Sequence, residues 1–172
     1  MDLKSKIREI QDFPQKGINF KDITPLLLDH EAFRYALQQM IHHFKNRKID
    51  VIASAESRGF IIGSVLAYEL KAGFVPLRKP GKLPYKTINQ EFEKEYGKDS
   101  FEMHEDAIKP GDNVLIVDDV LATGGTAKAA ANLVEKLGGR IASFVFLVEL
   151  GFLKGREKIS GYEIFSLMNF DK

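Results

Sequence analysis

The sequence predicts an α/β fold, a mainly parallel sheet of about five strands with helices on both faces. Short apolar segments typical of buried strands alternate with longer segments of helical spacing, an order typical of parallel sheets. Twice, a predicted strand ends in charged residues and a glycine just before a helix, at residues 50–59 and 114–125. Because ligands of open α/β sheets bind at the carboxyl ends of the strands, both turns are candidate binding sites.

The composition is that of one globular domain of 172 residues, long enough to bury a core. Its 25 lysines and arginines nearly balance 24 aspartates and glutamates, so the formal charge of +1 gives no field that attracts nucleic acid or anionic lipid. The absence of cysteine excludes disulfides and thiolate metal sites and is compatible with a reducing compartment. The first 14 residues have no apolar core, so we expect no signal peptide, and no apolar run approaches the ~20 residues of a membrane span. We therefore expect a cytoplasmic protein with no nucleic-acid or membrane partner.

The first third of the chain is predicted to form a short helix, a structured loop and a longer helix. Residues 2–10 have helical spacing and predict a short amphipathic helix. Residues 12–25 hold two prolines and a glycine but keep apolar side chains, so we expect a structured loop that lies over another surface. A packed arm that contacts no ligand is the alternative for this segment. Residues 31–45 predict a helix with one apolar face.

The remaining chain supplies the sheet. The predicted strands are 50–55, 73–77, 114–117, 141–150 and 162–168, and the predicted helices between them are 60–71 and 127–137. The polar segment 85–103 alternates weakly and predicts two strands of a hairpin that can move. A charged connection is expected at 154–158.

The stretch from 113 to 130, NVLIVDDVLATGGTAKAA, carries the strongest chemical signal. Four apolar residues, three of them β-branched, read as a strand buried on both faces. Asp118 and Asp119 follow, and we expect them where the strand leaves the sheet. Gly124 and Gly125 allow backbone N–H groups to close on an anion, and the start of the next helix adds partial positive charge.

A phosphorylated ribose would satisfy both halves of this motif. The hydroxyls of Thr123 and Thr126 add donors for a phosphate monoester, whereas the two aspartates would repel it and should face sugar hydroxyls instead. The alternative is an acidic turn and a glycine loop that bind no ligand.

Residues 117–126, VDDVLATGGT, resemble the phosphoribosyl-diphosphate signature of the type I phosphoribosyltransferases, and LATGGT resembles the adenine phosphoribosyltransferases among them. The resemblance extends from residues 10–14 to residues 166–167. It implies one phosphoribosyltransferase domain over 1–172, with an N-terminal hood at about 1–28 and a mobile loop at about 79–103. It also implies a cis peptide bond between Glu56 and Ser57.

The resemblance implies purine salvage, in which adenine and 5-phospho-α-D-ribose 1-diphosphate (PRPP) give AMP and diphosphate. Mg²⁺ would be held mainly through substrate oxygens and water, with no metal ligand set on the protein, and the chain would form a homodimer. One alternative is a transferase for another base. A second is a regulator that keeps the fold but binds nucleic acid, which needs a basic surface or an added domain.

The resemblance also assigns site residues. For ribose and its 5′-phosphate it implies Asp118, Asp119, Ala122, Thr123, Gly124, Gly125 and Thr126. For the diphosphate it implies Arg58, Lys79 and Lys82. For adenine it implies Asn19, Phe20 and Lys21 of the hood, together with Val120. The family usually has an apolar residue where this chain has Asn19, so we expect the backbone there to serve. The catalytic residue would be Glu95, although its spacing alone marks it only as one acid among several.

Overall fold

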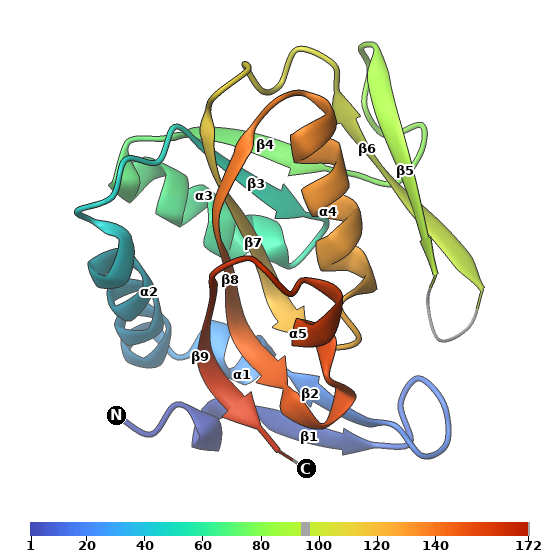
Figure 1. Ribbon diagram of the computed structural model, residues 1–172. Helices are drawn as coiled ribbons and strands as arrows, with labels where there is room; N and C mark the ends of the chain where they lie inside the picture. The colour runs from blue at the N-terminus through green and yellow to red at the C-terminus, as the bar shows by residue number, and fades with distance from the viewer. Residues whose placement is uncertain (94–96, 172) are drawn as a thin grey trace.

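The structure, a computed structural model, describes residues 1–93 and 97–171. Its centre is a five-stranded sheet in which every neighbouring pair is parallel (Figure 1). In spatial order the strands are β4 (Gly73–Leu77), β3 (Val51–Ala55), β7 (Asn113–Leu121), β8 (Arg140–Leu150) and β9 (Ile164–Phe170). The predicted fold class is confirmed, and β7, which carries the acidic motif, is the middle strand.

Helices cover both faces of this sheet. Alternate residues of β7 enter different cores, as the two-residue period of a strand requires: Leu115 and Val117 join α2 (His30–Phe44) and α3 (Gly59–Leu70). On the other face, Val114 and Ile116 pack with α4 (Gly125–Lys136). The apolar run of β7 is therefore buried from both sides, which is why its sequence does not alternate.

The N-terminal segment differs from the sequence prediction. The expected amphipathic helix over 2–10 is wrong: a 3-10 helix spans only Lys4–Lys6, and β1 (Arg8–Gln11) follows. The residues at helical spacing are still partly used, since Leu3 and Ile7 are buried. The backbone is extended because β1 pairs antiparallel with β2 (Asn19–Asp22), a strand in the segment expected as a loop. Next comes α1 (Thr24–Leu28).

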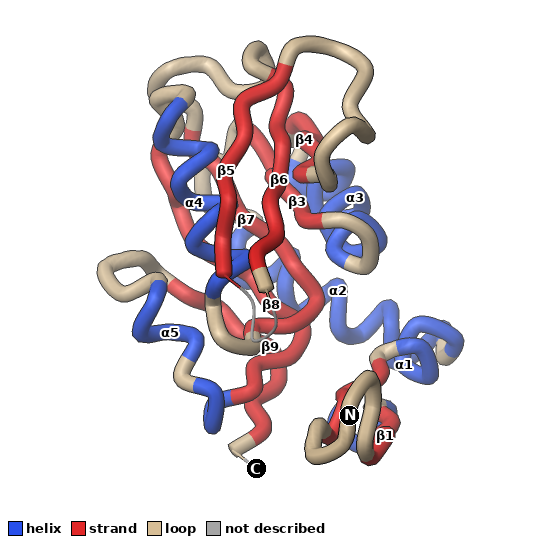
Figure 2. Tube along the Cα trace, turned by 90° about the vertical axis from the view of Figure 1, so that its right-hand side faces the viewer, coloured by secondary structure: helices blue, strands red, loops and turns tan. Residues whose placement is uncertain are grey.

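The polar segment between β4 and β7 forms the predicted antiparallel hairpin, β5 (Thr87–Glu93) with β6 (Lys98–His104). Figure 2 shows this hairpin standing beside α4, where Lys136 Nζ donates to Asn89 O at 3.1 Å and to Gln90 Oε1 at 2.9 Å. Phe92 and Phe101 are buried and join the core on the α4 side. The mobility of this hairpin stays a prediction.

The connection after β8 is more structured than expected. A 3-10 turn, η2 (Gly151–Leu153), and the short helix α5 (Gly155–Lys158) fill the segment predicted as a charged connection. Within the described residues, no helix combines the length and apolar character needed to cross a bilayer.

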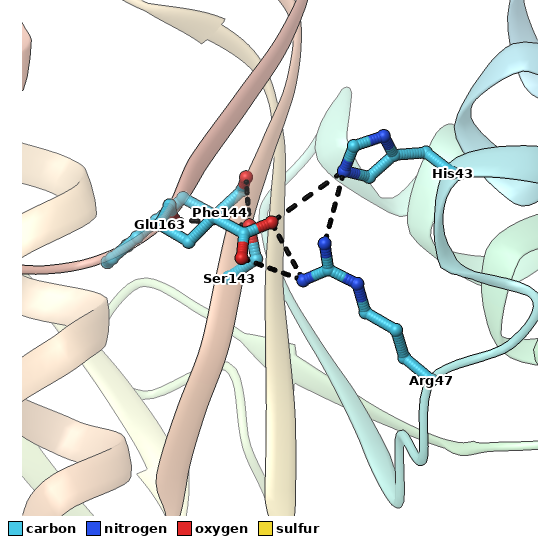
Figure 3. Close-up of polar contacts among 5 residues, drawn as sticks. All are labelled: His43, Arg47, Ser143, Phe144 and Glu163. Carbon is cyan, nitrogen blue, oxygen red and sulfur yellow. Dashed lines mark hydrogen bonds and ion pairs between the residues drawn. The ribbon is translucent and has the colours of Figure 1, made fainter.

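An ion pair joins the turn after α2 to the residue before β9 (Figure 3). Arg47 Nη1 lies 2.7 Å and 2.8 Å from the two carboxylate oxygens of Glu163, and His43 Nε2 lies 3.6 Å from one of them. Ser143 Oγ donates to the backbone carbonyls of Phe144 and Glu163, each at 3.1 Å. The hydrogen bond from Arg47 lowers the pKa of Glu163. This contact lies at the amino-terminal ends of β8 and β9, the edge of the sheet opposite the candidate site.

Candidate active site

A cleft of about 710 Å³ opens at the carboxyl ends of the central strands. Its wall combines segments far apart in sequence: the second strand of the N-terminal hairpin, the turn after β3, Lys79, the hairpin residues Phe92 and Phe101, and residues from the end of β7 and the start of α4. This volume is within the range of pockets that bind small molecules. The turn after β3 and the loop after β7, the two candidate binding sites of the sequence analysis, both border this cleft.

The end of β7 extends further than predicted. Pairing with β3 stops at Ser54 and Val117, but pairing with β8 continues to Leu121. Asp118 and Asp119 therefore remain within the strand, and the expectation that they mark its exit from the sheet is wrong. The reason is the length of β8, which runs to Leu150 and offers backbone partners that β3 does not. Asp119 is only 5% exposed.

The two aspartates have different surroundings. Asp118 Oδ1 accepts a hydrogen bond from the Asp119 backbone N–H at 2.8 Å. Burial, together with the neighbouring charge of Asp119, raises the pKa of Asp118 well above its ordinary value. Asp119 Oδ2 instead accepts from Arg58 Nε at 2.5 Å. One acid thus resists ionisation while the other is paired with a guanidinium.

The turn after β3 places Arg58. The Glu56–Ser57 peptide bond is cis, as the resemblance implied. Glu56 Oε2 accepts from Arg78 Nε at 2.7 Å, which ties the turn to the end of β4. The Arg58 guanidinium lies 5.3 Å from the centre of the Phe20 ring. It therefore sits between the N-terminal hairpin and the acidic pair, with further N–H donors for an anion.

The glycine loop has the geometry of an anion cradle. Gly124 has a φ of +80° and is the N-cap of α4, a conformation that a side chain would strain. A separate hollow of about 60 Å³ is bounded by residues 118 and 120–127 together with Phe146. Thr123 and Thr126 border both this hollow and the larger cleft. Backbone donors, hydroxyls and a helix N-terminus converge here, the arrangement that binds phosphate.

The N-terminal hairpin presents its residues on alternate faces. Asn19 Nδ2 donates to Glu9 Oε2 at 2.9 Å, and Lys21 Nζ forms an ion pair with Glu9 and lies 4.8 Å from the Phe170 ring centre. Phe20, between them, points toward Arg58. All three border the cleft. Only Phe20 has its side chain directed to the Arg58 side, so Asn19 and Lys21 have mainly backbone to offer a ligand there.

The expected diphosphate lysines differ in position. Lys79 borders the cleft, forms an ion pair with Asp99 and lies 4.9 Å from the Phe101 ring centre. Lys82 is exposed in the following turn and is not among the residues that border the cleft. Glu95 lies outside the described residues. The roles of all three stay predictions.

Sequence reasoning missed several residues of the cleft wall. Phe92 and Phe101 could have been found, because they are apolar residues in an otherwise polar hairpin and a hairpin buries one face. Glu56 belongs to the turn that the sequence analysis singled out, but no role was predicted for its side chain. Leu150 and Leu153 border the cleft without any local signal. Among the residues described, no cluster of three or more His, Cys, Asp or Glu side chains is arranged to hold a metal ion.

Asp118→Asn should stabilise the protein increasingly as pH rises. Because the pKa of Asp118 is raised in the folded state, folding favours its protonated form; that contribution is complete below the ordinary value of 3.8 and is lost as pH rises through the folded pKa. Asparagine keeps an oxygen for the Asp119 N–H but cannot ionise. Urea unfolding from about pH 4 to about pH 8 measures the effect. A gain that is constant with pH would show that Asp118 has no perturbed ionisation.

Comparison with known proteins agrees with this geometry. The family model of the phosphoribosyl transferase domain matches residues 26–169. An adenine phosphoribosyltransferase of Thermoanaerobacter sp. is 57% identical over 169 residues, 98% of each chain, and one of Clostridium perfringens is 56% identical over 171 residues, 99% of each. The crystal structure of the Thermoanaerobacter pseudethanolicus enzyme superposes with a TM-score of 0.95 at 56% identity over 98% of both chains. The Saccharomyces cerevisiae enzyme, solved with an imino-altritol bisphosphate and adenine, gives 0.90 at 43% identity over 96% of both. The chain belongs to the phosphoribosyltransferase family and, within it, to the adenine phosphoribosyltransferases.

Proposed function

We propose that this protein transfers the 5-phosphoribosyl group of PRPP to adenine, giving AMP and diphosphate in purine salvage. The observation that carries the proposal is the joining, in one cleft, of the acidic pair of β7 with the glycine loop at the start of α4. The adenine complex of the yeast relative supports the choice of base.

The sugar phosphate uses the two halves of this motif differently. The loop from Ala122 to Thr126 binds the 5′-phosphate through backbone N–H groups and hydroxyls, aided by the dipole of α4. The ribose hydroxyls lie against Asp118 and Asp119. Both carboxyls can accept hydrogen bonds from ribose hydroxyls, and the raised pKa of Asp118 favours its protonated form, which can also donate.

The diphosphate is held by Arg58, Lys79 and Lys82. Two of these cations already have carboxylate partners, Asp119 for Arg58 and Asp99 for Lys79, so diphosphate oxygens would compete with those acids. Among the described residues that line the cleft, the carboxylates are Asp118, Asp119 and Glu56, and the last two already accept hydrogen bonds from arginines. This arrangement suits a Mg²⁺ held mainly by substrate oxygens and water. When bound, Mg²⁺ supplies positive charge that neutralises the departing diphosphate.

Adenine stacks beside Phe20. The backbone at Asn19, Lys21 and Val120 forms hydrogen bonds with the edge of the base. The bond to the leaving diphosphate breaks as positive charge develops on the anomeric carbon, and the fixed cations stabilise the charge that leaves. The cytoplasm remains the proposed location, which a cysteine-free chain is compatible with.

Base selectivity tests the proposed substrate. The 6-amino group of adenine is a donor that backbone carbonyls can accept, whereas the 6-oxo group of hypoxanthine is an acceptor that they repel. A site built on such hydrogen bonds should discriminate by ~10⁴ or more in kcat/KM. Diphosphate release from PRPP with adenine, hypoxanthine, guanine and xanthine in turn measures this. Comparable turnover of a 6-oxo purine would overturn the assignment of adenine.

Glu95 is the proposed proton acceptor, on the strength of the resemblance alone. Adenine must lose an imidazole proton as its N9 bonds to ribose, and a carboxylate near N7 can take it. Glu95→Gln should reduce turnover by roughly 10²–10⁴ with little change in PRPP binding. The matched controls Glu91→Gln and Glu93→Gln, exposed on β5, should be nearly silent. Equal effects of all three variants would refute a catalytic role.

The homodimer that the resemblance implied is also proposed. The α3–β4 side of the molecule exposes large apolar side chains, Tyr68 at 82%, Ile61 at 41% and Phe74 at 37%, which a second copy would cover. Sedimentation should give twice the 19.4 kDa of one chain, and Tyr68→Glu with Ile61→Asp should shift the protein toward monomer. A monomeric wild-type protein at micromolar concentration would contradict the proposal.

A further inference from the structure

A bidentate ion pair lies beside the glycine loop. Glu149, near the end of β8, is 5% exposed and accepts hydrogen bonds from Arg156 Nε at 2.6 Å and Nη2 at 2.7 Å. Burial works to raise the pKa of Glu149, but the hydrogen bonds from Arg156 and Ser166 and the charge of Arg156 outweigh it, so the pKa is lowered. Arg–carboxylate forks of this kind fix orientation as well as position. The pair therefore anchors α5 to the sheet.

The first residue of α5 touches the glycine loop through its backbone. A Cβ atom on Gly155 would lie 2.3 Å from the Ala122 carbonyl oxygen and 3.1 Å from the Gly124 nitrogen. Conversely, a Cβ atom on Gly124 would lie 2.4 Å from the Gly155 carbonyl oxygen. The two main chains approach more closely than any side chain would permit. Any displacement of Gly155 is thus passed directly to the loop.

Among the described residues, the backbone approaches the loop closely at Gly155 and, on the other side, at Glu93. Gly124, the N-cap of α4, has no side-chain cap. On its other side, a Cβ atom on Gly125 would lie 2.8 Å from the Glu93 carbonyl oxygen of the β5–β6 hairpin. Gly155 belongs to a different segment, so its contact with the loop does not depend on the position of this hairpin, and Arg156 is the next residue in the chain.

We propose that Arg156 is a positioning residue for the sugar 5′-phosphate: its ion pair with Glu149 fixes α5, and Gly155 fixes the backbone of the loop from Ala122 to Gly124. This inference rests on the proposed function, because the phosphate is the ligand of that loop. Arg156 itself is not among the residues that border the cleft or the hollow of the loop, so it acts through Gly155. Its loss should weaken phosphate binding selectively.

The first test compares Arg156→Ala with Arg47→Ala. Both variants remove an arginine from a Glu pair next to the sheet. The Arg47–Glu163 pair (Figure 3) lies just before β9, whereas Glu149 lies near the carboxyl end of β8. Arg156→Ala should weaken binding of ribose 5-phosphate, measured by calorimetry, by roughly 10- to 100-fold, the range typical for groups that orient ligand-binding residues. The KM for PRPP should rise similarly while the KM for adenine changes little. Arg47→Ala should lower thermal stability without changing phosphate affinity.

Two further variants separate positioning from general stability. Arg156→Lys keeps the charge but not the fork, so it should restore phosphate affinity only in part. Gly155→Ala keeps both charged side chains of the ion pair but forces a methyl group against the Ala122 carbonyl, and it should reproduce the loss seen with Arg156→Ala. This variant also decides the matter if Arg156→Ala fails to fold.

Wild-type affinity for ribose 5-phosphate in either Arg156→Ala or Gly155→Ala would overturn the inference, as would equal weakening of adenine and phosphate binding. A different result would refute the proposed function: the wild-type protein would release no diphosphate from PRPP with any purine base. Direct binding of ribose 5-phosphate is measured without turnover, so the two failures are distinguishable.

Discussion

The unequal lengths of the strands beside β7 create the site. Pairing with β3 stops at Val117, but β8 supports β7 as far as Leu121, so the last residues of the strand have a backbone partner on one side only. The open side is where the cleft forms, and Asp118 and Asp119 lie there with their main chain still held in the sheet. The chain then passes from this rigid strand through the glycine loop into α4. The acidic pair and the glycine loop therefore keep a fixed spacing, which a flexible connection could not provide.

Charges in this cleft are held in pairs. Arg58 forms an ion pair with Asp119, Arg78 forms one with Glu56, and Lys79 forms one with Asp99. A polyanionic substrate can take over some of these cations while the displaced carboxylates turn to hydroxyls or a metal ion. Such exchange lowers the cost of desolvating the cations, because they are never left unpaired. In the proposed complex, this exchange would allow a protein with a formal charge of only +1 to bind a highly charged substrate.

The parts of this structure that could be predicted are those with strong local patterns. The strand predicted at 73–77 is observed at Gly73–Leu77, and the helix expected at 31–45 is observed at His30–Phe44. The failures arise where tertiary pairing overrides the local pattern: residues 8–11 pair with β2 instead of continuing a helix, and Asp118 and Asp119 stay in β7 because β8 is long. The contact between Gly155 and the glycine loop joins segments about 30 residues apart, so no local spacing could reveal it.

The central claim is that the loop at the end of β7 binds the 5′-phosphate of a nucleotide. The most direct measurement is calorimetric titration of the wild-type protein with AMP and, in parallel, with adenosine, which shares base and sugar but lacks the phosphate. The account predicts that AMP binds at least about 100-fold more tightly, since charge-assisted hydrogen bonds are worth about 1.5–3 kcal/mol each. Equal affinities for AMP and adenosine would contradict it.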